Sequence, residues 1–322
     1  MKRDVGADVL VDASVHPFRK ETAEVSAKEI IDGTLLYNQS KQHVRDFGKT
    51  QGDWCAPEQL SIGTLCSGTE VVSLAVHALS VAMKEADYET ELEVKFACES
   101  SPDKQRWVGS VFDVTWGEGP CIFRDINDMT SIDAHCVRHS RKCRIPRVNG
   151  VIAGTSCKDL SRANTRQRSD VLIPQASGTS ANTLSGLLGY LSVHCPDWCI
   201  LENVDELVSE SENLNLLCAH AAARGYDMQG YILDSLQYGL PQSRRRLYVV
   251  FARTSPRTMQ ITGGFDAFFK RVNNILVCAQ RLPPCITGCL LPGDDPRLQR
   301  ALAERAKEAP EVFTSNTIQA DG

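Results

Sequence analysis

The sequence predicts an α/β protein whose mostly parallel, doubly wound sheet carries an antiparallel hairpin at one edge. From Leu60 onwards, short apolar runs alternate with longer segments that have helical spacing. This alternation is typical of parallel strands joined by helices that cover both faces of a sheet. The last two apolar runs before Arg253 follow each other without a helix between them, which favours an antiparallel pair.

Each expected element has its own signal in the sequence. The apolar runs expected to form strands are residues 60–66, 92–98, 121–126, 149–154, 197–204, 226–235 and 245–253. Helices are expected at residues 69–86, 183–195 and 214–225. The first of them places Val72, Val76 and Leu79 on one face, and the last ends at Gly225, a residue type common just after a helix.

Three regions follow from these patterns. Residues 1–57 show no sustained period and are expected to form an N-terminal arm that is partly irregular. Residues 58–255 hold the alternating runs and form the expected α/β core. Residues 256–322 are expected to be a helical extension, with helices at 265–282 and 294–309.

Composition and charge exclude several classes of protein. The 322 residues are 42% hydrophobic and 23% charged, which is typical of a globular chain rather than a disordered or fibrous one. No apolar run reaches the roughly 18 residues that span a bilayer, so no membrane partner is expected. The 13 cysteines are scattered and odd in number, and no apolar signal segment precedes them, so we expect reduced thiols inside a cell.

The net charge of −5 hides two cationic stretches, residues 138–147 and 158–168. Such runs are either solvated faces or a local funnel for an anionic substrate on an otherwise acidic body.

Open parallel sheets bind ligands at the carboxyl ends of their strands, so the residues found there are candidate site residues. Glu99 follows the second strand, where a carboxylate either accepts ribose hydroxyls or favours a helix N-terminus. Asp125, with Asp128 nearby, follows the third strand and is placed to accept from an adenine amino group. The first strand ends in a turn that lacks the G-x-G-x-x-G of phosphate-binding loops and comprises Leu65, Cys66, Ser67, Gly68, Thr69 and Glu70. Together these residues suit an adenosyl ligand without a phosphate.

Cys157 follows the apolar run at 149–154. A cysteine in such a place is most often simply packed in the core. This one instead lies in a polar turn followed at once by Lys158 and then by Arg162, and nearby cations favour the reactive thiolate. Both interpretations, a packed thiol and a nucleophile, stay open on these residues alone.

Two further groups stand at strand ends. Glu202 closes the run at 197–204 and is either a helix cap or an acid held by hydrogen bonds. Three arginines enter the last strand, and the period of two puts Arg244 and Arg246 on one face and Arg245 on the other.

Residues 60–253 resemble the catalytic core of the cytosine carbon-5 DNA methyltransferases, a Rossmann-like family that uses S-adenosylmethionine. The P-C-x-x-x-S element of the family is similar to "SCKDLS" at 156–161. Its E-N-V element is intact at 202–204, and its Q-x-R-x-R element is intact at 242–246, after the "YGLP" that the family favours. The order and spacing of the three elements also fit.

The resemblance implies a role for each catalytic candidate. Cys157 would attack carbon 6 of a cytosine that has left its base stack, which makes carbon 5 nucleophilic. Glu202 would hold or protonate ring nitrogen 3, and Arg244 and Arg246 would contact the base carbonyl and the backbone. Carbon 5 would then take the methyl group, and loss of its proton would release the cysteine.

The resemblance also implies a cofactor and partners. S-adenosylmethionine would contact residues 65–70, Glu99 and Asp125, and the segment 161–180 would close over the base. DNA is the expected substrate. The alternative is that the chain is an RNA-directed member of the same family, which would use the same chemistry. The expected location is the nucleus of a eukaryotic cell, or otherwise the cytoplasm.

The sequence departs from the family pattern in three places. Ser156 stands where the family has proline, and the first turn is less rich in glycine. Only 69 residues follow Arg253, and they contain no Gly-Asn pair. The target-recognition domain is therefore expected to be reduced or missing, or supplied by a protein partner. A catalytically inactive protein that binds S-adenosylmethionine or DNA, and an unrelated α/β enzyme with a cysteine nucleophile, are the alternatives.

Two groups of residues were weighed as metal ligands. They are His135, Cys136, His139 and Cys143, and the pair Cys285 and Cys289. Neither group has the paired C-x-x-C spacing of common zinc sites, so the sequence predicts no metal site.

Overall fold

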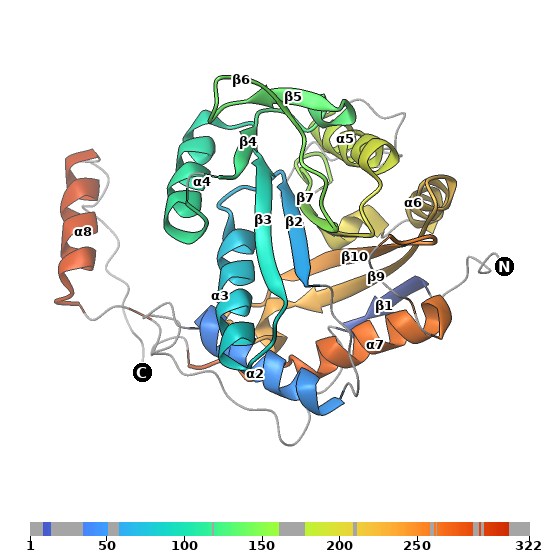
Figure 1. Ribbon diagram of the computed structural model, residues 1–322. Helices are drawn as coiled ribbons and strands as arrows, with labels where there is room; N and C mark the ends of the chain where they lie inside the picture. Colours follow the sequence, from blue (N-terminus) through green and yellow to red (C-terminus); the bar gives the residue numbers. More distant parts are fainter. Residues whose placement is uncertain are drawn as a thin grey trace.

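The protein is built around one ten-stranded sheet, with helices on either side of it (Figure 1). The computed structural model describes residues 9–13, 35–50, 58–117, 119–160, 178–208, 211–257, 261, 263–285, 290 and 293–308. The sheet order is β1-β9-β10-β8-β7-β2-β3-β4-β5-β6. The strands are β1 (Leu10–Asp12), β2 (Gln59–Leu65), β3 (Glu91–Cys98), β4 (Cys121–Phe123), β5 (Asp133–Cys136), β6 (Arg141–Arg144), β7 (Gly150–Gly154), β8 (Trp198–Asn203), β9 (Tyr226–Asp234) and β10 (Arg245–Arg253).

The centre of the sheet is parallel, as the alternating apolar runs predict. Strands β8, β7, β2, β3 and β4 pair in parallel from neighbour to neighbour. Their carboxyl ends therefore lie at one edge of the sheet, where residues that follow different strands come together.

Helices cover both faces, which confirms the doubly wound architecture. The α-helices are α2 (Leu35–Thr50), α3 (Val71–Glu85), α4 (Pro102–Thr115), α5 (Thr179–His194), α6 (Ser211–Ala223), α7 (Gly264–Cys278) and α8 (Pro296–Glu308). One buried cluster joins the sheet to α3 and α4 through Val76, Val108 and Phe112. A second joins it to α5 and α6 through Leu187 and Leu217. Two separate apolar layers on one sheet are the signature of a three-layer α/β protein.

The expected antiparallel hairpin is present as β9 and β10, paired from Arg245 with Asp234 to Arg253 with Tyr226. The sheet continues past it, because β1 pairs in parallel with β9. A second antiparallel hairpin, β5 with β6, ends the sheet at its other edge and was not expected from the sequence.

The described parts of the N-terminal arm belong to this fold. Besides β1 in the sheet, α2 packs against α3 and buries Val44 in the same cluster as Val76. Tyr37 and Lys41 both bond to Glu85 near the end of α3. The division of the chain at residues 57 and 255 stays a prediction.

Two glycines let large side chains lie against the sheet. A Cβ at Gly150 would stand 1.9 Å from Cε2 of Trp198, its partner in β8, and a Cβ at Gly63 would stand 2.2 Å from Cζ of Phe96. The aromatic rings therefore occupy the space that a side chain would need. In the part of the chain that the structure describes, no helix is both long and apolar enough to cross a membrane.

Candidate active site

The turn between β2 and α3 has an unusual backbone. Cys66, Gly68 and Glu70 have φ angles of 54°, 60° and 57°, in the left-handed region that glycine adopts most easily. For the two residues that carry side chains, this conformation costs on the order of 1 kcal/mol each. A Cβ at Gly68 would meet nothing nearer than the carbonyl oxygen of Cys66, at 4.0 Å. Among the described residues beyond its chain neighbours, no other atom comes within 4 Å of that position.

Glu70 supports the turn from inside the protein. Its side chain is fully buried, and the hydroxyl of Thr64 donates to its two carboxylate oxygens at 3.0 and 3.1 Å. Burial raises the pKa of Glu70 to about 7, although hydrogen bonds from Thr64 and Ser67 oppose the shift. Leu65 is also fully buried, so neither of these two predicted cofactor residues presents its side chain to solvent.

Glu99 joins the ends of two strands. One carboxylate oxygen accepts from the backbone N–H of Gly68 at 2.8 Å, and the other accepts from the N–H of Ser101 at 2.9 Å. The side chain is only 6% exposed, so these bonds satisfy a carboxylate that would be costly to bury alone. Glu99 thereby fixes the first turn relative to β3.

Asp125 lies close to the same turn. Its Oδ1 accepts from the backbone N–H and the side-chain amide of Asn127, at 2.9 and 3.0 Å. Burial, with the nearby carboxylates of Glu99 and Asp125, raises the pKa of Cys66 to about 12, so this thiol stays neutral. The competitor Asp128 faces Arg124 instead, at 4.0 Å.

These residues fit an adenosyl cofactor that carries a sulfonium. Glu99 and Asp125 repel phosphate groups but attract a positive charge, and both can accept from hydroxyl or amino groups. The hydrogen-bonding groups of Glu99 and Asp125 are therefore chemically compatible with S-adenosylmethionine.

The turn that carries Cys157 is tied to two neighbouring elements. Asn203 of β8 donates from Nδ2 to the hydroxyl of Thr155 at 2.8 Å and to its carbonyl at 3.3 Å. The backbone N–H of Ser156 donates to the hydroxyl of Thr183 in α5 at 3.0 Å. Cys157 is half-buried and packs against the apolar core with part of its surface open.

Glu202 and Arg246 form an ion pair across two adjacent strands. Arg246 Nε lies 3.2 Å from Glu202 Oε1, and the two side chains are 24% and 34% exposed. Burial raises the pKa of Glu202, and the positive charges of Arg246 and Arg244 partly offset that rise. The E-N-V and Q-x-R-x-R elements, far apart in the sequence, meet here.

Gly154 connects this pair to the cofactor turn and to the cysteine. It is the partner of Glu202 in the parallel register of β7 and β8. A Cβ on Gly154 would stand 3.6 Å from Glu202 Oε2 and 3.7 Å from the carbonyl oxygen of Cys66. Glu202 and the first turn therefore approach each other over this glycine, three residues before Cys157.

The three arginines divide between the faces as the strand period predicts. Arg245 pairs with Asp12 of β1 at 3.0 Å and with Asp205 at 3.3 Å, whereas Arg246 pairs with Glu202. Arg244 is exposed, and its charge acts on Glu202. Arg245 therefore ties strands together, and the other two face the candidate site.

Asp234 organises the turn that leads into these arginines. It accepts from the backbone N–H of Arg244 at 2.9 Å and from the hydroxyl of Ser243 at 2.6 Å. Burial alone would raise the pKa of Asp234, but these bonds and one from the Leu236 N–H outweigh burial and lower it. The expected closing loop at 161–180 lies outside the described residues except for its last three, 178–180.

A family model described as C-5 cytosine-specific DNA methylase matches residues 65–274. The chain belongs to this family. The matched region contains all the predicted catalytic and cofactor-binding residues, from Leu65 to Arg246.

Several relatives of this methylase-family chain are known. DNA (cytosine-5-)-methyltransferase DMT5 of Cryptococcus neoformans is 30% identical over 256 residues, which is 77% of this chain and 10% of that protein. The type II methyltransferase M.HaeII of Haemophilus aegyptius is 26% identical over 159 residues, or 48% of this chain and 44% of that enzyme. A solved structure of a mutant DNMT2 from Spodoptera frugiperda has a TM-score of 0.39 and 18% identity, covering 61% of this chain and 50% of that one. The chain thus spans less than half the length of the curated relatives.

Some residues of the methylase site were missed in the sequence. Asn203 was noticed only as part of a motif, yet its amide holds the cysteine turn. Asp234 and Gly154 gave no motif signal, because their roles depend on hydrogen bonds and strand register. The sequence grouped Cys136, His139 and Cys143 with His135 and predicted no metal site. In the structure these three residues meet Cys121, which comes from a different strand, in place of His135.

Proposed function

We propose that this chain transfers a methyl group to carbon 5 of cytosine in DNA through a covalent adduct with Cys157. The observation that carries the proposal is the ion pair between Arg246 and Glu202, whose atoms lie 3.2 Å apart. Glu202 lies beside Gly154, which precedes Cys157 by three residues. The two curated relatives are both methyltransferases, and the first is named as acting on DNA cytosine.

The residues have the chemical character that the reaction needs. The sulfur of Cys157 forms a bond to carbon 6, and the electrons of the carbon 5–carbon 6 double bond move toward carbon 5. Glu202, whose pKa is raised by burial, holds a proton at ring nitrogen 3 so that negative charge does not build up on the ring. Bound S-adenosylmethionine supplies the methyl group. Loss of the carbon 5 proton then breaks the sulfur–carbon bond and restores the cysteine.

Arg246 and Arg244 supply positive charge on the same side as Glu202. Arg246 orients the carboxyl group of Glu202, and Arg244 is exposed where a phosphate or base carbonyl can be contacted. Preorganised charges of this kind stabilise a transition state without reorganising during the reaction.

A mechanism-based trap tests this function. DNA that carries 5-fluorocytosine cannot lose fluorine as a proton, so with S-adenosylmethionine present the adduct should persist through denaturing electrophoresis. Cys157→Ala should abolish the adduct, whereas Cys195→Ala, at another half-buried cysteine, should form it normally.

Other outcomes of the trap decide between the alternatives. An adduct with fluorinated RNA but not with DNA would replace the DNA proposal by RNA methylation. If neither polymer forms an adduct while calorimetry still detects S-adenosylmethionine binding, the chain is an inactive binding protein. The chain spans only part of the length of its relatives, so we also propose that a partner or another segment recognises the target. A nuclear location is a further part of the proposal.

A further inference from the structure

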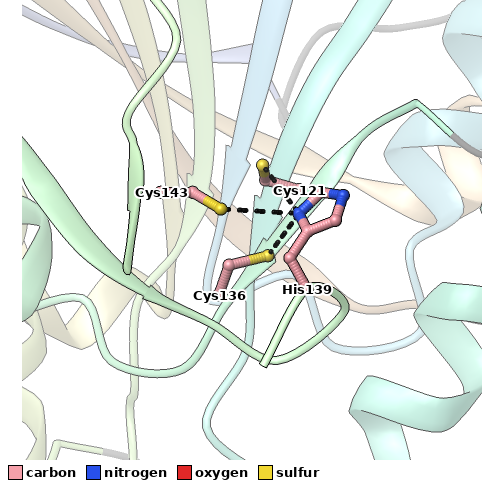
Figure 2. A group of neighbouring side chains, drawn as sticks. All are labelled: Cys121, Cys136, His139 and Cys143. Atoms are coloured by element: carbon pink, nitrogen blue, oxygen red, sulfur yellow. Dashed lines mark hydrogen bonds between the residues drawn. The ribbon is translucent and has the colours of Figure 1, made fainter. Parts of the chain in front are cut away.

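Three cysteines and one histidine gather at the edge of the sheet that lies farthest from β1. They are Cys121, Cys136, His139 and Cys143, and their sulfur and ring nitrogen atoms all lie within 4.8 Å of one another. Figure 2 shows the three sulfurs pointing toward the same ring nitrogen. We call these four residues the Cys₃His cluster.

The fold, rather than sequence spacing, builds the cluster. Cys121 is the first residue of β4, Cys136 is the last residue of β5, and Cys143 lies in β6. His139 lies in the tight turn between β5 and β6, where Ser140 has a left-handed φ of 51°. The antiparallel pairing of β4 with β5 and of β5 with β6 brings the three strands together at this point.

Hydrogen bonding does not explain the convergence. His139 Nδ1 lies 3.6 Å from the sulfur of Cys121, 3.2 Å from that of Cys136 and 3.5 Å from that of Cys143. One ring nitrogen makes a single directional hydrogen bond, as donor or acceptor, so it cannot satisfy three thiols. Three sulfurs around one nitrogen instead match a shared central atom.

The distances agree with tetrahedral coordination. With a metal–sulfur bond of about 2.3 Å and a metal–nitrogen bond of about 2.0 Å, each sulfur of a tetrahedral zinc site lies about 3.5 Å from the nitrogen. The three measured separations, 3.2 to 3.6 Å, bracket that value. Three cysteines also cannot all pair as disulfides among themselves.

We propose that the Cys₃His cluster binds a structural Zn²⁺ ion through three thiolates and Nδ1 of His139. Sulfur and imidazole ligands in a tetrahedron are typical of zinc, and four protein ligands leave no open position for catalysis. The three thiols give up their protons to solvent when the metal binds. The hairpin also carries Arg141, Lys142 and Arg144, whose charges offset the net negative charge of the loaded site.

The metal would fix a part of the fold that has little core of its own. β5 and β6 are four residues each, and β6 is largely exposed. Such a hairpin is marginally stable without further support. A shared ion would hold it to β4, the short strand that leads within two residues to Asp125 of the cofactor site. The zinc ion is therefore expected to stabilise the local fold rather than to take part in methyl transfer.

Metal analysis of the purified full chain tests the proposal. After dialysis against metal-free buffer, mass spectrometry of the elements should find about one zinc ion per chain. Replacement by Co²⁺ should give the intense visible bands of tetrahedral cobalt and a thiolate charge-transfer band. Both measurements use the unaltered protein, so they do not depend on a variant that folds.

Matched variants locate the site. Cys143→Ser and His139→Asn should each reduce bound zinc at least tenfold, and they should weaken the thiolate band or shift the cobalt bands. Cys195→Ser, whose hydroxyl can replace the thiol as donor to the carbonyl of Ser192, should keep full metal content. A folded wild-type chain without zinc and without the tetrahedral cobalt spectrum would overturn the proposal. Full zinc retention by both ligand variants would overturn it equally.

Discussion

Asn203 donates from its side-chain amide to both oxygens of Thr155, at 2.8 Å to the hydroxyl and 3.3 Å to the carbonyl. Both residues are buried, at 2% and 4% exposure. Thr155 lies two residues before Cys157, and Asn203 directly follows Glu202. The residue next to the candidate acid therefore holds the turn that carries the candidate nucleophile, so the two groups are positioned by one strand end.

Removing this amide should loosen the cysteine turn. Asn203→Ala leaves the buried oxygens of Thr155 without a donor, which costs about 1–3 kcal/mol of stability. We expect slower formation of the fluorocytosine adduct with little change in S-adenosylmethionine affinity, measured by trapping kinetics and calorimetry. In a double-mutant cycle, Thr155→Val should cause little further loss of stability when Asn203 is already replaced by alanine. Additive losses would show that the two side chains do not act together.

The charge of Arg246 should set the pH range over which Glu202 holds its proton. Burial raises the pKa of Glu202, and Arg246 opposes that rise, so Arg246→Gln should raise the pKa further. In the proposed mechanism the protonated acid is the active form, so activity should be lost as pH rises through this pKa. The falling limb of the single-turnover pH profile should therefore move to higher pH in the variant, with the rate lowered about 100-fold.

Arg245→Gln is the matched control for this experiment. Arg245 pairs with Asp12 and Asp205 on the opposite face of the strand. We expect this variant to lose some stability and to keep the wild-type pH midpoint. An equal shift in both variants would contradict a specific pairing of Arg246 with Glu202.

Glu70 should make the protein less stable as pH rises. Its pKa is about 7 in the folded chain and 4.5 for an ordinary glutamate, so the folded state favours the protonated form. The stability present below about pH 4.5 is then lost progressively up to about pH 7, by about 3 kcal/mol in total. Urea unfolding at several pH values should show this slope, and Glu70→Gln should flatten it. If the dependence of stability on pH is unchanged in Glu70→Gln, Glu70 is not its source. Glu304→Gln, at an exposed glutamate, is the control and should keep the wild-type dependence.

Gly150 should be intolerant of any side chain. A Cβ there would lie 1.9 Å from Cε2 of Trp198, so Gly150→Ala forces the indole to move and costs about 1–3 kcal/mol. Trp198→Leu should relieve the clash, so the double variant should be more stable than the sum of the single losses predicts. Denaturant unfolding of the four proteins measures this coupling, and strict additivity would refute the steric explanation.

Much of the sheet could be predicted from the sequence, because buried strands consist of apolar runs. The helices that cover them repeat apolar residues every three to four positions. The runs before Glu99 and Glu202 became β3 and β8, and the period of two separated Arg245 from Arg246. Strand ends were therefore visible in advance, and with them the positions of the candidate site residues.

The remaining features depend on tertiary contacts that no local pattern encodes. β1 is three residues long, too short to show a period. The hydrogen bond that Asp234 accepts from the backbone N–H of Arg244 depends on how the turn folds. The Cys₃His cluster requires β4 beside β5, since Cys121 precedes Cys136 by 15 residues.

The pairing of β1 with β9 has a practical consequence for work on this protein. The family match begins at residue 65, so even a fragment lengthened to Gln59 to keep all of β2 would lack both β1 and α2. Its β9 would expose a row of unpaired backbone groups, and the apolar flank of α3 that receives Val44 would face water. Exposed strand edges recruit other chains, so such a fragment should precipitate or form oligomers. Expression designs that keep residues 9–50 avoid this outcome.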